Sequence, residues 1–134
     1  MFRDEMKKAA EDFGLTLSEN QLAQFTRYYE LLVEWNEKMN LTAITEEHEV
    51  AVKHMVDSLS AYDPALFDGE ISIIDVGTGA GFPGLPLKIA QPDISLTLLD
   101  SLDKRVRFLG DVCAATGLAD VTCLHARAEE APEL

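Results

Sequence analysis

A glycine-rich segment is the part of this sequence whose residue types and spacing most clearly suggest chemistry. It reads Asp75-Val76-Gly77-Thr78-Gly79-Ala80-Gly81-Phe82-Pro83-Gly84. It lies between a β-branched run typical of a buried strand and an apolar segment typical of a helix. Glycines at such a junction let the backbone turn sharply and approach a ligand closely. The segment therefore predicts a ligand-binding loop, although three glycines alone would also fit a simple tight turn.

The spacing of these glycines favours a ligand without phosphates. The dinucleotide-binding fingerprint GxGxxG would require glycine at position 82, where the sequence has Phe82. The glycines instead occupy alternate positions, at Gly77, Gly79 and Gly81. With Asp75 just ahead of them, this pattern predicts binding of S-adenosylmethionine rather than of a dinucleotide.

Polar residues also follow the next two predicted strands. Asp100 ends the second strand, 19 residues after Gly81, and an acid at that place can accept hydrogen bonds from both hydroxyls of an adenosine ribose. The segment Arg127-Ala128-Glu129 follows the third strand. Ligands of open α/β sheets bind at the carboxyl ends of the strands, so these groups and the glycine loop predict one site. Taken alone, Asp100 would also fit a solvated strand end, and Asp75 a helix-capping or loop-bracing acid.

Helical spacing dominates residues 1–62, which are expected to form a helical N-terminal cap. Apolar residues recur every three or four positions, and a capping box begins the second helix at Ser18. This second helix is expected to end near Asn40, and a third to begin at Thr45. Turn-forming residues fill 63–70, which is the predicted linker.

The period changes beyond the linker, and residues 71–134 predict the order β-α-β-α-β. The expected elements are a strand over 71–76, a helix through 87–90, a strand over 95–99, a helix over 103–116 and a strand over 121–124. Strands that alternate with helices form parallel sheets with right-handed crossovers. The sequence therefore predicts an α/β fold, in which the helical cap precedes the N-terminal half of a Rossmann-like parallel sheet.

Composition limits the other classes of protein. The 134 residues are 47% hydrophobic and 26% charged with a net charge of −13, so we expect a packed core and no strong nonspecific binding to nucleic acid. No apolar run is long enough to span a membrane, and the start lacks the apolar core of a secretory signal. Cys113 and Cys123 match neither a metal-binding pair nor a disulfide framework. A reduced, cytoplasmic protein without a metal site is the simplest expectation.

Several segments, in order along the chain, carry a resemblance to a known family: Asn40-Leu41-Thr42-Ala43-Ile44, His54-Met55-Val56-Asp57-Ser58-Leu59, the glycine loop, Leu98-Leu99-Asp100-Ser101, Lys104-Arg105, Phe108-Leu109 and Arg127-Ala128-Glu129. Over about residues 20–130 the chain resembles the bacterial ribosomal RNA small-subunit methyltransferase G family, also called glucose-inhibited division protein B. The resemblance implies a Rossmann-like methyltransferase fold. It also implies an enzyme that uses S-adenosylmethionine to methylate N7 of a guanine in 16S ribosomal RNA.

The resemblance further implies which residues bind the cofactor. Gly77, Phe82, Ala128 and Glu129 would contact S-adenosylmethionine, and Asp100 would bind its ribose. Guanine N7 already has an unprotonated lone pair, so methyl transfer requires no general base and no catalytic residue is assigned. We expect the rate to come from alignment and from the electrostatic field around the sulfonium.

Four side chains in the cap have two interpretations that the sequence leaves open. His54 could act at the site, although a histidine on an amphipathic helix more often packs or caps. Tyr29 and Trp35 could stack on bases, but their helical spacing favours core positions. Asn40 could contact substrate or merely end its helix.

A basic cluster, Lys104, Arg105 and Arg107, begins the helix after Asp100. It could hold RNA phosphate or simply offset a solvated acidic face. Because the chain is strongly acidic, this cluster is the local patch from which contact with RNA would be expected.

The resemblance also implies that the sequence is C-terminally truncated. The family's chain is longer, its sheet has more strands, and it carries a cofactor-contacting arginine for which this sequence has no position. The first strand would then have an unpaired apolar edge, so dimerisation or aggregation through that edge is expected, and methyl transfer by this chain alone should be weak or absent. Two other functions remain as alternatives: a nucleotide-dependent oxidoreductase half-domain and a non-catalytic binding or assembly module.

Overall fold

The computed structural model describes residues 1–60, 71–127 and 129. Its elements are, in chain order, α1 (Phe2–Phe13), α2 (Glu19–Asn36), α3 (Glu47–Glu49), the π-helix η1 (Val50–Val56), α4 (Asp57–Leu59), β1 (Ser72–Val76), α5 (Gly84–Ala90), β2 (Ser95–Asp100), α6 (Asp103–Thr116) and β3 (Val121–His125). The predicted order, cap helices followed by β-α-β-α-β, is confirmed. The predicted linker at 63–70 lies outside the described residues.

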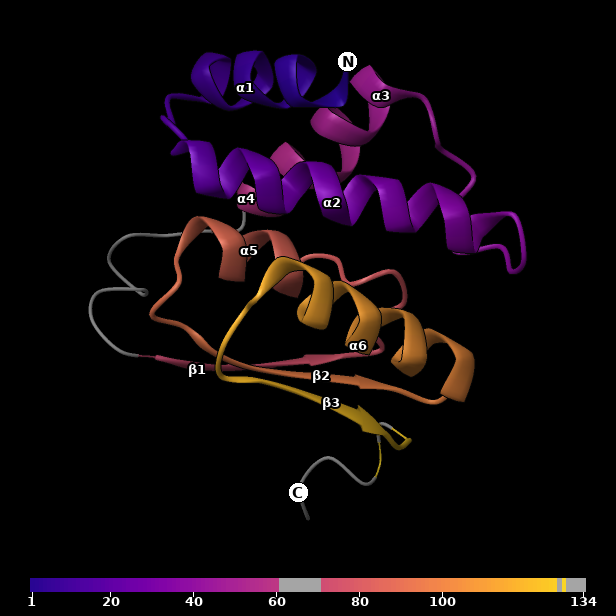
Figure 1. Ribbon diagram of the computed structural model, residues 1–134. Helices are drawn as coiled ribbons and strands as arrows, with labels where there is room; N and C mark the ends of the chain where they lie inside the picture. The colour runs from indigo at the N-terminus through magenta and orange to yellow at the C-terminus, as the bar shows by residue number, and fades with distance from the viewer. Residues whose placement is uncertain (61–70, 128, 130–134) are drawn as a thin grey trace.

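The three described strands form one parallel sheet in the order β1-β2-β3. Ser72 pairs with Ser95 at the start of the β1–β2 ladder, and Asp100 pairs with His125 at the end of the β2–β3 ladder. Helices α5 and α6 cover the same face of the sheet (Figure 1). Two right-handed crossovers that step in one direction along a sheet require this arrangement. The carboxyl ends of the strands therefore meet at one edge, where the glycine loop and Asp100 lie.

The cap helices form a further layer over α5 and α6 (Figure 1). Helix α2 packs along both α5 and α6, and α1 packs against α2 and η1. Phe25 and Tyr28 of α2 are fully buried in the same core as Leu85 of α5 and Phe108 of α6. The cap and the sheet thus share one continuous core.

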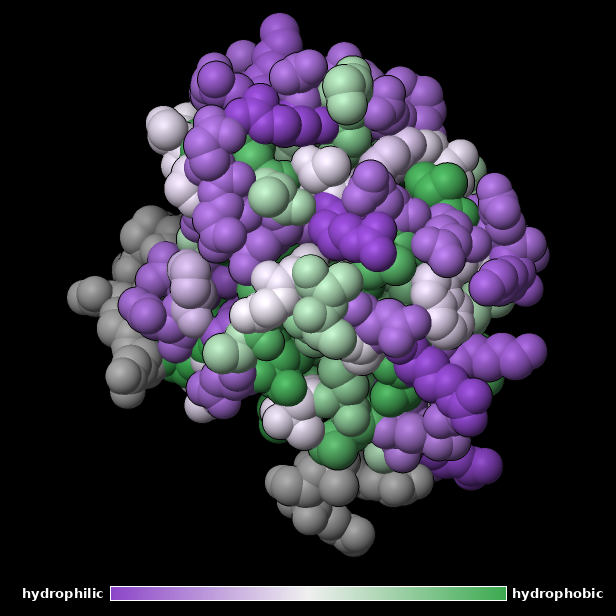
Figure 2. Space-filling model, viewed as in Figure 1, coloured by the Kyte–Doolittle hydropathy of each residue, from purple (hydrophilic) through white to green (hydrophobic). Residues whose placement is uncertain are grey.

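The outer surface of the cap is mainly hydrophilic, as the upper part of Figure 2 shows. Hydrophobic side chains appear instead lower in this view, toward the strand layer. Among the described helices, none is both long and apolar enough to cross a membrane.

Tyr29 and Trp35 occupy core positions, as their helical spacing predicted. The Tyr29 ring stacks on Phe2 with 4.3 Å between centroids, and the Trp35 ring meets Phe108 edge-on at 6.0 Å. Both aromatic residues are partly buried against the core. The interpretation that they stack on bases is therefore not supported.

The end of α2 differs from the prediction. The helix stops at Asn36 rather than near Asn40, because the Asn36 side-chain oxygen accepts hydrogen bonds from the amides of Leu41 at 2.7 Å and Thr42 at 2.9 Å. These two bonds turn the chain out of the helix and fix the start of the segment that follows it.

The third helical stretch begins at Glu47 rather than at Thr45. The Glu46 carboxylate caps this start by accepting hydrogen bonds from the amides of His48 and Glu49. The stretch then continues through α3, η1 and α4. The π-helical turn in its middle is of a kind often found near functional sites.

Tyr28 connects the cap to the glycine loop. Its buried hydroxyl donates a hydrogen bond to the carbonyl oxygen of Ala80, 52 residues further along the chain. Burial, reinforced by the nearby carboxylate of Asp75, raises the pKa of Tyr28 well above its ordinary value, so this hydroxyl stays protonated and keeps its role as a donor.

Replacing Tyr28 by Phe should lower the free energy of unfolding by about 1–3 kcal/mol, because the buried Ala80 carbonyl loses its donor. Tyr29→Phe is the matched control, since the Tyr29 hydroxyl donates to the Thr45 carbonyl at an exposed position and its loss should cost less. Urea denaturation of both variants measures the difference. An equal cost for the two substitutions would contradict the importance of the link to the loop.

Candidate cofactor site

Asp75, near the end of β1, braces the glycine loop. One of its carboxylate oxygens accepts hydrogen bonds from the Thr78 hydroxyl at 2.7 Å and from the Gly84 amide at 3.0 Å. Gly84 is the first residue of α5, so the carboxylate also faces the positive end of a helix. Burial raises the pKa of Asp75, whereas the two hydrogen bonds oppose that rise. The loop-bracing role considered for Asp75 is confirmed.

Asp100 joins the loop to the start of α6. Its Oδ2 accepts a hydrogen bond from the Gly79 amide and its Oδ1 accepts one from the Leu102 amide, each at 2.9 Å. The Arg105 Nη1 lies 3.6 Å from Oδ1. At 2% exposure Asp100 is not a solvated strand end, and its predicted place beside the glycine loop is confirmed. Its hydrogen bonds to a ribose stay a prediction.

The backbone amides of the loop donate mainly within the protein. Five of them have partners at 2.8–3.2 Å: Gly77 and Thr78 donate to the Leu99 carbonyl, Gly79 to Asp100, Gly81 to the Thr78 carbonyl and Gly84 to Asp75. Phosphate-binding loops instead direct such amides at the ligand. The carboxylate of Asp75, at the helix start where a pyrophosphate would lie, would also repel it. This geometry agrees with the phosphate-free ligand that the glycine spacing predicts.

Close packing requires two of the glycines. A Cβ on Gly84 would lie 2.9 Å from the Asp75 Oδ2, and helix α5 could then not start where it does. Gly81 has a φ of +99°, and a Cβ there would lie 2.6 Å from the Tyr28 hydroxyl and 2.6 Å from the Leu85 side chain. Any side chain at these two positions would therefore force the loop to change its shape.

Gly77 and Gly79 mark the open side of the loop. A Cβ on either glycine would meet no heavy atom within 4 Å, so a ligand can approach the backbone here. Of the predicted contacts after β3, Glu129 is exposed and Ala128 lies outside the described residues.

Phe82 lies where the loop meets the cap. Its ring is partly buried, with the Tyr28 ring 5.8 Å away and the His54 ring stacked on it at 4.6 Å between centroids. The Nε2 of His54 is 2.7 Å from the Thr42 hydroxyl. Sequence reasoning left the role of His54 open and did not single out Tyr28 or Thr42. The signal available for Thr42 was its place in the segment 40–44 that carries the family resemblance.

A groove brings Asn40 next to the basic cluster. Its volume is about 530 Å³, and its lining residues are Met39, Asn40, Leu102, Asp103, Lys104 and Arg105. Arg105 and Arg107 each pair with an aspartate beside them, so part of the positive charge is offset locally. Lys104 is exposed at this groove. The structure thus places two of the candidates for substrate contact together.

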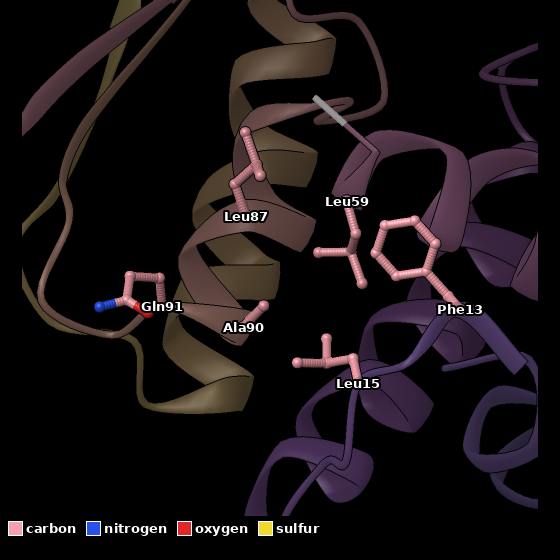
Figure 3. A pocket seen from close by; sticks show the side chains of 6 residues that line it. All are labelled: Phe13, Leu15, Leu59, Leu87, Ala90 and Gln91. Carbon is pink, nitrogen blue, oxygen red and sulfur yellow. The ribbon is translucent and has the colours of Figure 1, made fainter. Parts of the chain in front are cut away.

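A second hollow lies between the cap and α5, at the end of α5 away from the glycine loop (Figure 3). It measures about 130 Å³, and its lining residues are Phe13, Leu15, Leu59, Leu87, Ala90 and Gln91. Because five of these six side chains are apolar, the hollow offers little to hold a ribose or a charged amino acid. This hollow is therefore a poorer candidate for such a ligand than the open side of the glycine loop.

Comparison with known proteins identifies the family. Residues 21–134 match the family model described as rRNA small subunit methyltransferase G. The chain belongs to this family. The resemblance that the sequence motifs carry is confirmed, as is the Rossmann-like fold that it implies.

Relatives named Ribosomal RNA small subunit methyltransferase G support this membership. The chain is 54% identical over 125 residues to the protein of Alkaliphilus metalliredigens (strain QYMF), an overlap of 93% of this chain and 52% of the relative. It is 52% identical over 134 residues to the protein of Lactococcus lactis subsp. cremoris (strain MG1363), covering 97% of this chain and 55% of the relative. The chain spans about half the length of the methyltransferase G relatives it matches.

Replacing Asp75 by Ala should lower the free energy of unfolding by about 1–3 kcal/mol, because the Thr78 hydroxyl and the Gly84 amide both lose their acceptor. Asp93→Ala, which removes an exposed carboxylate between α5 and β2, is the control and should change stability little. Urea denaturation of the two variants provides the measurement. Equal stability of both would show that Asp75 does not brace the loop.

Proposed function

We propose that this chain forms the cofactor-binding part of an S-adenosylmethionine-dependent methyltransferase that acts on N7 of a guanine in 16S ribosomal RNA. The observation that carries the proposal is the glycine loop, whose amides donate within the protein and which two carboxylates flank. Such a loop suits a cofactor that carries a cationic sulfonium and an ammonium group but no phosphate. The family resemblance supplies the ribosomal RNA substrate and the guanine N7 acceptor.

Each of the residues at the carboxyl edge of the sheet would bind a different part of the cofactor. The open side of the loop would take the part next to the sulfonium, and Phe82 would flank it. Asp100 would accept hydrogen bonds from the ribose hydroxyls. A carboxylate offers about four acceptor positions, so Asp100 can bind ribose while it keeps its bonds to the Gly79 and Leu102 amides. Ala128 and Glu129 would complete the site after β3.

When bound, the cofactor supplies a methyl group activated by a sulfonium. Guanine N7 carries an unprotonated lone pair, so the residues of this chain need not move a proton. Their contribution is orientation, because Asp75 and Asp100 fix the loop and the loop fixes the donor. The same two carboxylates favour a cationic ligand at this edge. No residue is assigned as a general acid or base.

Contact with RNA would involve the groove beside Asn40 and Lys104. It opens near the start of α6, and its exposed lysine suits a phosphate. The net charge of −13 opposes strong binding of this chain to free RNA. This groove would therefore help to orient a substrate that is held mainly by other contacts.

The two alternatives make different predictions about ligands. A nucleotide-dependent oxidoreductase would bind NADH, which a fluorescence titration detects, but the occupied amides and the Asp75 carboxylate at the helix start disfavour its pyrophosphate. A binding or assembly module built on the cap would keep its partner after the glycine loop is blocked.

Calorimetry with S-adenosylhomocysteine should show binding to the wild-type chain and roughly tenfold weaker binding, or none, to Gly77→Arg, because the new side chain would fill the open side of the loop. Gly117→Arg is the matched control. Gly117 has nearly the same φ, +68° against +69°, and equally open surroundings, but it lies at the far end of α6. Binding to Gly77→Arg at wild-type strength, or no binding to the folded wild-type chain, would contradict the proposed function.

Self-association through β1 is a further part of the proposal. Among the described residues, β1 has a neighbouring strand on one side only. Ile74 and Val76, on the face of β1 away from α5, are 53% and 45% exposed. Apolar strands with an unpaired edge tend to pair with other chains. We therefore expect dimers or larger aggregates at high concentration.

Light scattering should show this association for the wild-type chain and less of it for Ile74→Lys, because a charge on the exposed strand disfavours pairing. Val52→Lys is the control, since Val52 is 39% exposed in the cap, away from the sheet. A monomeric wild-type chain at high concentration, or equal effects of the two substitutions, would contradict pairing through β1.

A further inference from the structure

Two segments that are distant from His54 in the sequence contact its imidazole ring, one through Phe82 and the other through Thr42. Phe82 belongs to the glycine loop, His54 to η1, and Thr42 to the connection between α2 and α3. The His54 and Phe82 rings are stacked, with 4.6 Å between centroids and 15° between planes. The Thr42 hydroxyl lies 2.7 Å from the Nε2 of His54. The result is a chain of contacts from the cap to the loop.

Thr42 and His54 also have hydrogen bonds to their own neighbours. The amide of Thr42 donates to the Asn36 side chain at 2.9 Å, and the Thr42 hydroxyl accepts a hydrogen bond from the Ile44 amide at 3.1 Å. The backbone carbonyl of His54 accepts a hydrogen bond from the Ser58 hydroxyl. The imidazole ring is therefore held at its Nε2 edge by the Thr42 hydroxyl, which the Asn36 and Ile44 contacts keep in place.

Simple packing does not account for a histidine here. An aliphatic side chain would fill the same space without the cost of burying a polar ring. Burial lowers the pKa of His54, and the opposing effect of Asp57 is smaller, so the ring is predominantly neutral at pH 7. A flat neutral ring with a hydrogen-bonding edge can both stack on an aromatic side chain and hold a fixed orientation.

Phe82 is enclosed by aromatic rings from two cap elements, because Tyr28 of α2 lies 5.8 Å from it at an angle of 32°. The Tyr28 hydroxyl also bonds the loop two residues earlier, at Ala80. A displacement of His54 would leave the Phe82 ring free to move on one side while Tyr28 still held the other. His54 and Tyr28 are therefore both in a position to limit the movement of the Phe82 ring.

We propose that His54 is a positioning residue for cofactor binding: its imidazole, held by Thr42 and stacked on Phe82, sets the position of the Phe82 ring and so the binding shape of the glycine loop. The inference rests on the proposed function, since it concerns the affinity of the same loop for S-adenosylmethionine. It makes the cap a part of the cofactor site through a residue that need not touch the cofactor.

Calorimetry with S-adenosylhomocysteine on four variants tests this inference. His54→Ala removes the stacked ring and should weaken binding about tenfold, whereas His54→Phe keeps a flat ring and should restore affinity to within about threefold of wild type. Thr42→Val keeps the branched shape but loses the hydroxyl, and should weaken binding about threefold. His48→Ala is the control, because His48 is an exposed cap histidine that pairs with Glu5. It should bind like the wild type.

Circular dichroism identifies the variants that are folded before their affinities are compared. If folded His54→Ala binds within twofold of the wild type, or if His54→Phe binds as weakly as His54→Ala, the positioning role is wrong. If His54→Ala does not fold, Thr42→Val decides, and wild-type affinity in that variant would overturn the inference. Absence of binding by the wild-type chain would instead refute the proposed function, so the two failures are distinguishable.

Discussion

The carboxylate of Asp75 is the contact on which the site depends most directly. It accepts hydrogen bonds from the amide that begins α5 and from the hydroxyl of Thr78, so one half-buried carboxylate near the end of β1 closes the loop and caps the start of the helix. Gly84 makes this possible, because any side chain there would collide with that carboxylate. Asp100, at the end of the neighbouring strand, braces the same loop by accepting a hydrogen bond from the amide of Gly79. Two acids from adjacent strands therefore hold one loop.

The same two acids also determine the chemical character of the loop. A glycine loop at the start of a helix usually offers free amides and a positive helix end to an anion. In this chain five of the loop amides have partners within the protein and the helix end faces a carboxylate, which favours the cationic ligand that we propose. A glycine loop alone therefore does not reveal its ligand, and the partners of its amides must be considered as well.

The sheet does not build the site by itself. The hydroxyl of Tyr28 and the ring of His54 reach the loop from two different cap elements. They act on opposite parts of it, on the backbone at Ala80 and on the side chain at Phe82. Because these contacts lie in the core shared by α2, α5 and α6, the cap cannot move as a separate unit without changing the loop.

Local patterns were sufficient to predict the order of the elements and the place of Asp100 beside the glycine loop. Period and breaker residues located the helices and strands, and the rule for parallel sheets brought the glycine loop and Asp100 together. The end of α2 was missed because a single side-chain acceptor on Asn36 decides it. The partners Tyr28 and His54 were not predicted, because periodicity shows which face of a helix is buried but not which distant residue covers it. The contact between Tyr28 and Ala80, 52 residues apart, depends on how the folded chain packs and is not encoded in any local pattern.

The distance in sequence between Tyr28 and Ala80 has a consequence for folding. A contact across 52 residues forms only after a long segment of chain has closed into a loop. The conformational entropy of that segment is lost before the contact can contribute to stability. We therefore expect the glycine loop to reach its final shape late, once the cap and the sheet have docked. For the same reason, a ligand that binds only the completed loop binds only the fully folded chain. Such a ligand should protect the cap helices against unfolding as strongly as the strands.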